Sequence, residues 1–196
     1  MRIAVCVRQG LDGELNPFDA SAYEIALSEA GAEVIPVSMG VPKTADLLLH
    51  LTRLGASRAI LLSDPIFAGS DTLATAYVLS RAMEKLKPDR ILCGRKTLIG
   101  DTGQVPPMLA EMAGYEFLPD VLTVADGNAV TREGNRNIPP RALLAAEKQA
   151  VLRLPSLLSR VGTVETWNAA DIGADPMRCG LNGSPTRVLE TRENTA

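Results

Sequence analysis

Apolar runs and helical patterns alternate through the first 115 residues of the chain. Four short apolar runs, at residues 2–8, 32–40, 58–64 and 90–94, do not alternate apolar with polar residues, which is typical of strands buried on both faces. A segment with helical spacing of apolar residues follows each run. This alternation predicts an α/β domain with a doubly wound, mainly parallel sheet covered by helices on both faces.

Several residues mark where the predicted helices begin. Asn16 is expected to cap the first helix, with Pro17 at its first helical position. Ser70 or Asp71 is expected to open the third helix. Pro36 lies inside the second apolar run and cannot donate a ladder hydrogen bond, so we expect that strand to lie near an edge or a bend.

The pattern changes after about residue 118. Residues 120–133 predict two strands joined by a hairpin turn at the letters DGN. Residues 141–162 fit either a strand or a helix. The C-terminal region is rich in Gly, Pro and Asn and has little periodicity. We therefore predict a domain over residues 1–165 and an extended arm over residues 166–196 that wraps a partner.

Composition narrows the class of protein. The chain has 196 residues, 46% of them hydrophobic, a net charge of −3 and a pI near 5.3. It can therefore build a full core, and it lacks the basic surface expected of a nucleic-acid-binding protein. The apolar runs are too short for a signal peptide or a membrane span, so we expect a cytoplasmic protein without membrane insertion.

The residues that usually carry catalysis are sparse. Cys6, Cys93 and Cys179 form no CxxC pair, which argues against a zinc site or a redox dithiol. The single histidine, His50, lies in a predicted helix, and Ser70 has no GxSxG surroundings. We find no nucleophile and base to pair, and we predict neither catalytic residues nor a metal site.

The carboxyl ends of the predicted parallel strands indicate where a ligand binds. In a doubly wound sheet, ligands lie beyond these ends, near the point where the strand order reverses. Three strand-to-helix turns, at residues 7–19, 37–43 and 93–104, are therefore expected to share one pocket.

The turn with the sequence LIGDTGQVPP, residues 98–107, carries the most useful groups. Thr102 offers a hydroxyl and Gln104 an amide, while Gly100 and Gly103 let the backbone approach a ligand closely. At a helix N-terminus these groups favour an anion such as a phosphate. The alternative is that Asp101 merely caps the helix, and the turn alone leaves both interpretations open. Neither a Walker motif nor a GxGxxG fingerprint is present.

Five blocks of sequence, in order, resemble the β subunit of electron-transfer flavoproteins. They lie at residues 16–27, 67–94, 100–105, 167–176 and 180–188. The resemblance implies a fold similar to adenine-nucleotide α-hydrolases and pairing with a larger α subunit that binds most of the electron-carrying FAD. It also implies that this chain holds AMP, or a second FAD, and has no catalytic residue of its own. Its further partners would be a flavin-dependent dehydrogenase or a quinone oxidoreductase.

The resemblance also implies a set of functional residues. The nucleotide would meet Cys6, Asn16, Pro17, Phe18, Asp19, Met39, Gly94, Arg95, Lys96, Thr97, Leu98, Ile99, Gly100, Asp101, Thr102, Gly103, Gln104 and Val105. Leu157 would dock an electron-transfer partner, and the arm 166–196 would contact the α subunit. The chain departs from the family pattern at Ile99, where an acidic residue is usual, and at Pro106 and Pro107.

A second hypothesis is a stand-alone nucleotide-binding regulatory protein of similar fold, resembling universal stress proteins. The block at residues 180–188 discriminates between the two hypotheses, because a stand-alone domain needs no arm to wrap a partner. This block favours the electron-transfer subunit.

Overall fold

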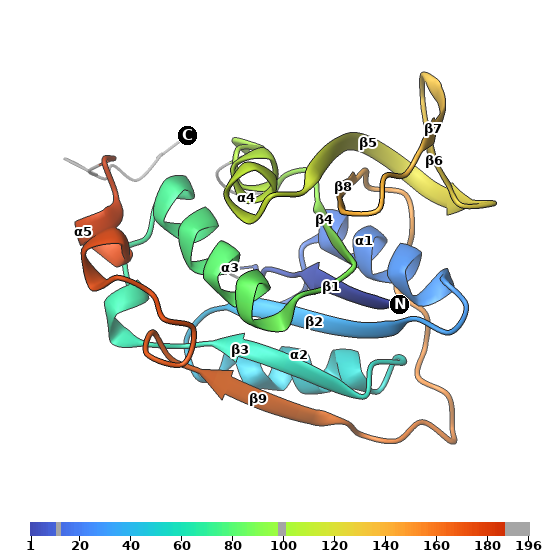
Figure 1. Ribbon diagram of the computed structural model, residues 1–196. Helices are drawn as coiled ribbons and strands as arrows, with labels where there is room; N and C mark the ends of the chain where they lie inside the picture. The colour runs from blue at the N-terminus through green and yellow to red at the C-terminus, as the bar shows by residue number, and fades with distance from the viewer. Residues whose placement is uncertain (11–12, 98–100, 187–196) are drawn as a thin grey trace, which may run out of the picture.

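The computed structural model describes residues 1–10, 13–97 and 101–186, and within them nine strands form a single sheet in the order β7-β6-β5-β8-β4-β1-β2-β3-β9 (Figure 1). The strands are β1 (Arg2–Cys6), β2 (Glu33–Met39), β3 (Arg58–Leu62), β4 (Arg90–Gly94), β5 (Glu116–Ala125), β6 (Asn128–Thr131), β7 (Gly134–Asn137), β8 (Ala142–Ala146) and β9 (Thr163–Trp167). In this order, every neighbouring pair from β5 to β9 is parallel, and the pairs β5–β6 and β6–β7 are antiparallel.

Helices cover both faces of this sheet. They are α1 (Pro17–Ser28), α2 (Thr44–Thr52), α3 (Thr72–Leu86), α4 (Val105–Ala113) and the short α5 (Gly180–Gly183), with 3-10 turns η1 (Pro65–Phe67) and η2 (Pro176–Arg178). In Figure 1, α3 and α4 lie in front of the sheet, and α1 and α2 lie behind it. The doubly wound α/β prediction is confirmed.

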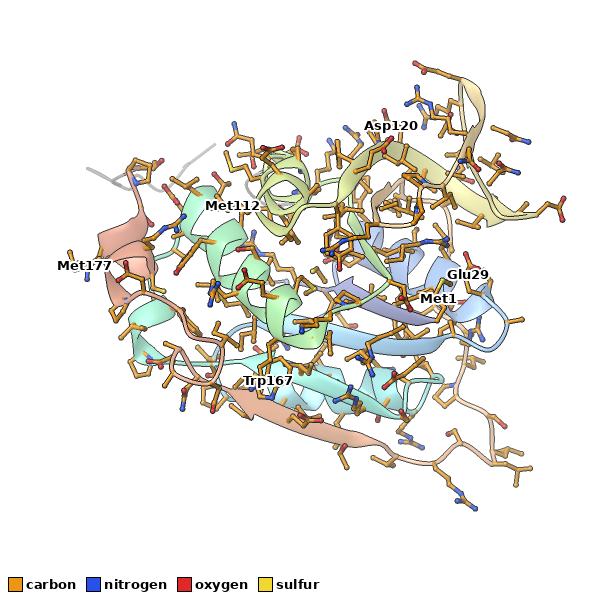
Figure 2. The ribbon with its side chains drawn as sticks, in the orientation of Figure 1. Met1, Glu29, Met112, Asp120, Trp167 and Met177 are labelled. Carbon is orange, nitrogen blue, oxygen red and sulfur yellow. The ribbon has the colours of Figure 1, made fainter. Side chains whose placement is uncertain are left out.

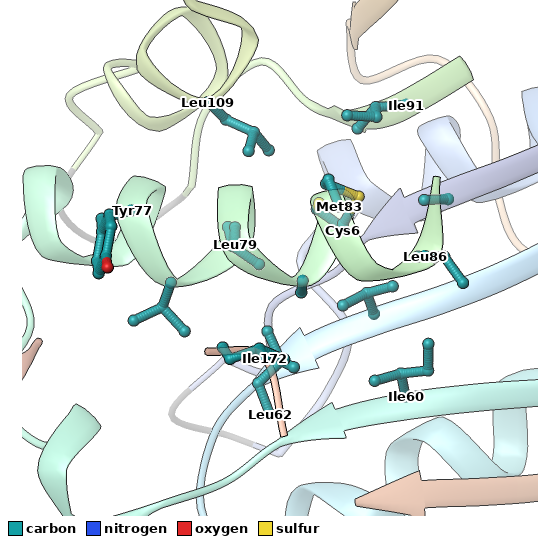
Figure 3. Close-up of a cluster of buried hydrophobic side chains, with 14 of the residues drawn as sticks. Cys6, Ile60, Leu62, Tyr77, Leu79, Met83, Leu86, Ile91, Leu109 and Ile172 are labelled. Atoms are coloured by element: carbon teal, nitrogen blue, oxygen red, sulfur yellow. The ribbon is translucent and has the colours of Figure 1, made fainter. Parts of the chain in front are cut away.

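The core consists of two apolar layers, one on each face of the sheet. In the layer under α3, Leu79 and Met83 of the helix join Ile60 and Ile91 of the strands (Figure 3). In the other layer, Ile25 of α1 and Leu48 of α2 pack against strand residues on the opposite face of the sheet, such as Leu61 and Leu92. Because each central strand contributes to both layers, its residues are almost all buried, as the unbroken apolar runs predict.

The start of each long helix tests the capping predictions. Asp71 caps α3, since its Oδ1 accepts hydrogen bonds from the backbone nitrogens of Leu73 and Ala74, both at 3.0 Å. Asn16 occupies the N-cap position of α1, but its side chain makes no capping bond. Instead its Nδ2 donates to the carbonyl oxygen of Lys96 at 3.0 Å. Asn16 therefore ties α1 to the turn after β4.

Of the two alternatives predicted for the strand with Pro36, an edge or a bend, the edge is wrong. Strand β2 lies between β1 and β3 in the interior of the sheet. Its pairing with β3 begins at Val37, while Pro36 is in register with Val5 of β1. Pro36 thus lies in the part of β2 that is paired on one side only, where a missing N–H group is tolerated.

The hairpin prediction in the second half is confirmed. Strands β5 and β6 are antiparallel, and Asp126 and Gly127 between them both have positive φ, as a two-residue type I′ turn requires. Strand β7 adds a third strand to this hairpin. In the segment 141–162, which fitted either a strand or a helix, only residues 142–146 are regular: they form β8, a fully buried strand between β5 and β4, and the remainder is irregular.

The described part of the C-terminal region packs on the domain itself. Strand β9 pairs with β3. Trp167, at the end of β9, lies under α3 (Figure 2), and the centre of its ring is 4.1 Å from Nζ of Lys85 on that helix. Ile172 and Cys179 are buried in the core layer under α3. The boundary predicted between residues 165 and 166 falls inside β9. Residues 187–196 lie outside the described part of the chain, so the contact of a C-terminal arm with a partner stays a prediction. Among the residues described, no helix combines the length and apolarity needed to cross a bilayer.

Candidate functional site

A cavity of about 390 Å³ opens at the carboxyl ends of β1, β2 and β4. The strand order reverses here, because the chain continues from β1 to β2 and β3 on one side and from β4 towards β8 and β5 on the other. This is the place where doubly wound sheets bind ligands. The three predicted turns do meet at one cavity.

Most of the predicted nucleotide contacts line this cavity. They are Cys6, Asp19, Met39, Gly94, Arg95, Lys96, Thr97, Thr102, Gly103, Gln104 and Val105. Four others, Asn16, Pro17, Phe18 and Asp101, are not among its lining residues but adjoin those that are. Leu98, Ile99 and Gly100 lie outside the described residues.

Sequence reasoning missed one wall of the cavity. Ser70, Asp71, Thr72, Thr75 and Leu79, from the turn before α3 and the first turns of that helix, face the predicted phosphate turn. The other lining residues not named as nucleotide contacts lie within the predicted turns or the stretch 98–107: Val7, Arg8, Val37, Cys93 and Pro106. The turn after β3 is a fourth strand-to-helix turn on the same edge of the sheet, so the alternation of elements contained the signal for this wall.

The turn before α4 is shaped by local backbone geometry. Asp101 has a φ of +42° and Gly103 a φ of +61°, and Lys96 Nζ holds the Asp101 carboxylate at 2.7 Å. The N-cap of α4 is Gln104, without a side-chain capping bond. The alternative that Asp101 merely caps the helix is therefore wrong.

The double proline has a simple place in this turn. Pro106 and Pro107 occupy the first turn of α4, which begins at Val105. Backbone N–H groups in the first turn have no partner within the helix, so proline costs nothing there and its fixed φ suits the helix. Gly103 and Gln104, just before the prolines, line the cavity.

Hydrogen bonds to the Asp19 carboxylate connect the start of α1 to the ends of two strands at the cavity. Its Oδ2 accepts from the backbone nitrogen of Arg8 at 2.8 Å, and its Oδ1 from that of Gly94 at 2.9 Å. Burial raises the pKa of Asp19 to about 7, and the hydrogen bonds from Arg8, Asn16 and Gly94 oppose that rise. A Cβ on residue 94 would lie 2.4 Å from Asp19 Oδ1, so only glycine fits.

The floor of the cavity is apolar. Cys6 and Cys93 are in register on β1 and β4 and line the cavity side by side. Burial, with a smaller contribution from the charge of Asp19, raises the pKa of Cys6 to about 12, and burial likewise raises that of Cys93. Both stay neutral thiols, which are weak nucleophiles, and with Met39 they offer a surface suited to a flat apolar group.

Cationic groups surround the mouth of the cavity. Arg8, Arg95 and Lys96 line it. Arg95 Nε lies 2.7 Å from a carboxylate oxygen of Glu147, and Lys96 Nζ lies 5.9 Å from the centre of the Phe18 ring. The combination of cations, hydroxyls and an apolar floor can hold an anionic group at one end and an aromatic base at the other.

Leu157, the predicted docking residue, lies away from this cavity in the irregular segment between β8 and β9. Its side chain is fully exposed, as are those of Val151, Leu154 and Leu158 nearby. Exposed apolar residues grouped in this way are typical of interaction sites.

Comparison with known proteins identifies the family. The model of the electron transfer flavoprotein domain matches residues 3–151. The chain belongs to this family. It is 35% identical to the electron transfer flavoprotein subunit beta of Clostridium acetobutylicum, over 94% of this chain and 78% of that protein. It is 34% identical to the caffeyl-CoA reductase-Etf complex subunit CarD of Acetobacterium woodii, with the same coverage of each.

A third relative carries a different name within the same family. Protein FixA of Azorhizobium caulinodans is 35% identical over 93% of this chain and 74% of that protein. Membership of the electron transfer flavoprotein family gives the chain a role in electron transfer. The stand-alone regulatory alternative is not favoured.

Proposed function

We propose that this chain is the nucleotide-holding subunit of an electron-transfer flavoprotein. Its cavity holds an adenine nucleotide, either AMP or the AMP half of a second FAD. A larger α subunit binds most of the electron-carrying FAD. The single observation that carries the proposal is the cavity at the carboxyl ends of β1, β2 and β4, at the reversal of strand order and beside the predicted phosphate turn.

The residues around the cavity suit each part of such a nucleotide. Thr102, Gly103 and Gln104 stand at the N-terminus of α4, where backbone N–H groups and the helix dipole favour a phosphate. Arg8 brings positive charge to the cavity, as does Lys96, whose charge is shared with Asp101, and Cys6 and Met39 line the apolar floor. The volume of about 390 Å³ lies near the lower end of the range of about 300–1,000 Å³ typical of ligand sites, which suits a mononucleotide or that half of a dinucleotide.

The chain's own residues bind and orient in this proposal, and none of them is catalytic. The flavin supplies the electron chemistry when it is bound. Leu157 docks an electron-transfer partner, such as a flavin-dependent dehydrogenase or a quinone oxidoreductase, and residues 166–196 contact the α subunit. The complex works in the cytoplasm.

Co-purification tests the proposal. The chain, co-expressed with a candidate α subunit, is expected to elute as a heterodimer with flavin absorbance. Purification as a stable monomer that carries neither flavin nor AMP would overturn it.

A further inference from the structure

The last described residues of the chain, 184–186, form hydrogen bonds with Asp71, a residue that lines the cavity. The backbone nitrogen of Asp71 donates to Ser184 Oγ at 2.8 Å, and the backbone nitrogen of Thr186 donates to Asp71 Oδ2 at 3.1 Å. Ser184 is buried, and its hydroxyl donates to the carbonyl oxygen of Gly180 at 2.7 Å. Asp71 lines the cavity, whereas Ser184 and Thr186 do not.

Close packing supports these hydrogen bonds. A Cβ on Gly180 would lie 2.2 Å from the carbonyl oxygen of Ile66, and one on Gly69 would lie 2.6 Å from the side chain of Leu181. Helix α5 therefore fits directly against η1 and the turn that leads into α3. Such tight packing fixes the position of Ser184 relative to Asp71.

The contacts continue from Asp71 to the predicted phosphate turn. Thr72 follows Asp71 at the start of α3, and its Oγ1 donates to Gln104 Oε1 at 3.3 Å. A chain of hydrogen bonds and one peptide link thus runs from residues 184–186, through Asp71 and Thr72, to Gln104. The Asp71–Thr72 end of the α3 wall of the cavity therefore contacts both the C-terminal segment and the predicted phosphate turn.

The charge of Asp71 gives the connection a second effect. A carboxylate at the rim of a phosphate site repels the ligand unless its charge is offset. Partial burial opposes ionisation, but hydrogen bonds from Ala74, Thr186 and Leu73 outweigh it and lower the pKa of Asp71. Loss of the Thr186 donor would leave more of this negative charge directed at the cavity.

We propose that Ser184 and Thr186 are positioning residues for the nucleotide: they hold the Asp71–Thr72 end of α3 against Gln104 and help to offset the charge of Asp71. The proposal rests on the proposed function, because it concerns affinity at the same cavity. It assigns a role in ligand binding to two residues of a C-terminal segment that do not line the cavity.

Calorimetric titration of the full-length chain with AMP tests this role. The variants Ser184→Ala and Thr186→Pro each remove one link, and Thr186→Ser is the matched control because it keeps both the N–H group and the hydroxyl. Each disrupting variant is expected to raise the Kd for AMP about tenfold, equivalent to about 1.4 kcal/mol, and to change the Kd for adenosine less. The control is expected to bind as the wild type does.

The outcomes separate this inference from the proposed function. A wild-type chain that binds neither AMP nor FAD would overturn both. For a chain that binds only FAD, the same variants are compared by their Kd for FAD. A wild type that binds AMP, with folded variants whose Kd is within twofold of it, would overturn this inference alone. Hydrogen exchange on the wild type gives a readout that needs no variant: AMP is expected to slow exchange of the Thr186 amide, and unchanged exchange there would also contradict the inference.

Discussion

The carboxylate of Asp19, on α1, accepts a hydrogen bond from the backbone nitrogen of Gly94, at the end of β4, at 2.9 Å. The other carboxylate oxygen accepts from Arg8, just beyond β1. One buried side chain therefore joins the two strands between which the order of the sheet reverses. The shape of the cavity depends on this junction.

Replacing Gly94 by alanine is expected to destabilise the protein. The added Cβ would lie 2.6 Å from Phe18 Cβ and 2.8 Å from the backbone nitrogen of Asp19, so α1 must shift. Overpacking of this kind costs about 1–3 kcal/mol, measurable by urea unfolding. Gly94 does not have a positive φ, so crowding by the added Cβ, and not backbone strain, accounts for the expected cost. A Gly94→Ala variant as stable as the wild type would refute the close fit.

Asp19 is expected to make the stability of the protein depend on pH. Its pKa rises from 3.8 to about 7 on folding, so the folded state holds a proton that the unfolded state releases. The free energy of unfolding should therefore be highest below about pH 4 and should fall as the pH rises through 7. Urea unfolding at several pH values measures this slope.

Asp19→Asn provides the comparison for that slope. Asparagine does not titrate, so the part of the pH dependence that Asp19 causes should disappear. The variant should also be less stable overall, since its amide group cannot accept from both Arg8 and Gly94. Equal slopes in the variant and the wild type would show that Asp19 stays ionised in the folded protein.

Much of the fold could be predicted because the central strands are buried on both faces. The unbroken apolar runs of these strands and the capping of α3 by Asp71 can be recognised from a few neighbouring residues in the sequence. The position of Pro36 could not be predicted, because it depends on where pairing with β3 begins. Strand β9 was missed for a similar reason: it is a short edge strand whose residues are mostly part-exposed, so it lacks an apolar run.

The candidate site could be predicted only in part. The turn before α4 has hydroxyl, amide and glycine residues close together in sequence, so its chemistry is visible without a structure. The wall formed by Ser70, Thr72 and Thr75 has ordinary helix-start residues. The alternation of elements indicates the edge of the sheet on which it lies, but its place at the cavity depends on the neighbouring positions of β2 and β3. The contact of Ser184 with Asp71 spans 113 residues and left no local signal.

The double variant Thr102→Ala with Gln104→Ala tests the phosphate turn. Two hydrogen bonds to a charged phosphate, at about 1.5–3 kcal/mol each, should together cost about 3–6 kcal/mol of binding free energy. The purified variant should retain little nucleotide. Thr123→Ala, an exposed change on β5 away from the cavity, should retain it fully. Unchanged retention in the double variant would place the phosphate elsewhere.

Leu157→Ala should affect docking and leave folding intact. The side chain is fully exposed, so its loss should change stability by no more than about 0.5 kcal/mol. An anchoring residue at an interface contributes about 2 kcal/mol or more, so the Kd for the partner dehydrogenase should rise about thirtyfold or more. Leu49→Ala, an exposed leucine on α2 outside both the docking segment and the arm, is the control. Equal electron-transfer kinetics in both variants would exclude Leu157 as the anchor.

The central claim is that the cavity holds an adenine nucleotide within a flavoprotein complex. The most direct measurement is to denature the purified complex and quantify the nucleotides released. One AMP with one FAD per heterodimer, or two FAD per heterodimer, is the predicted result, and the ratio decides which ligand occupies this cavity. Release of a single FAD with no AMP would show that the cavity is empty and would contradict the claim.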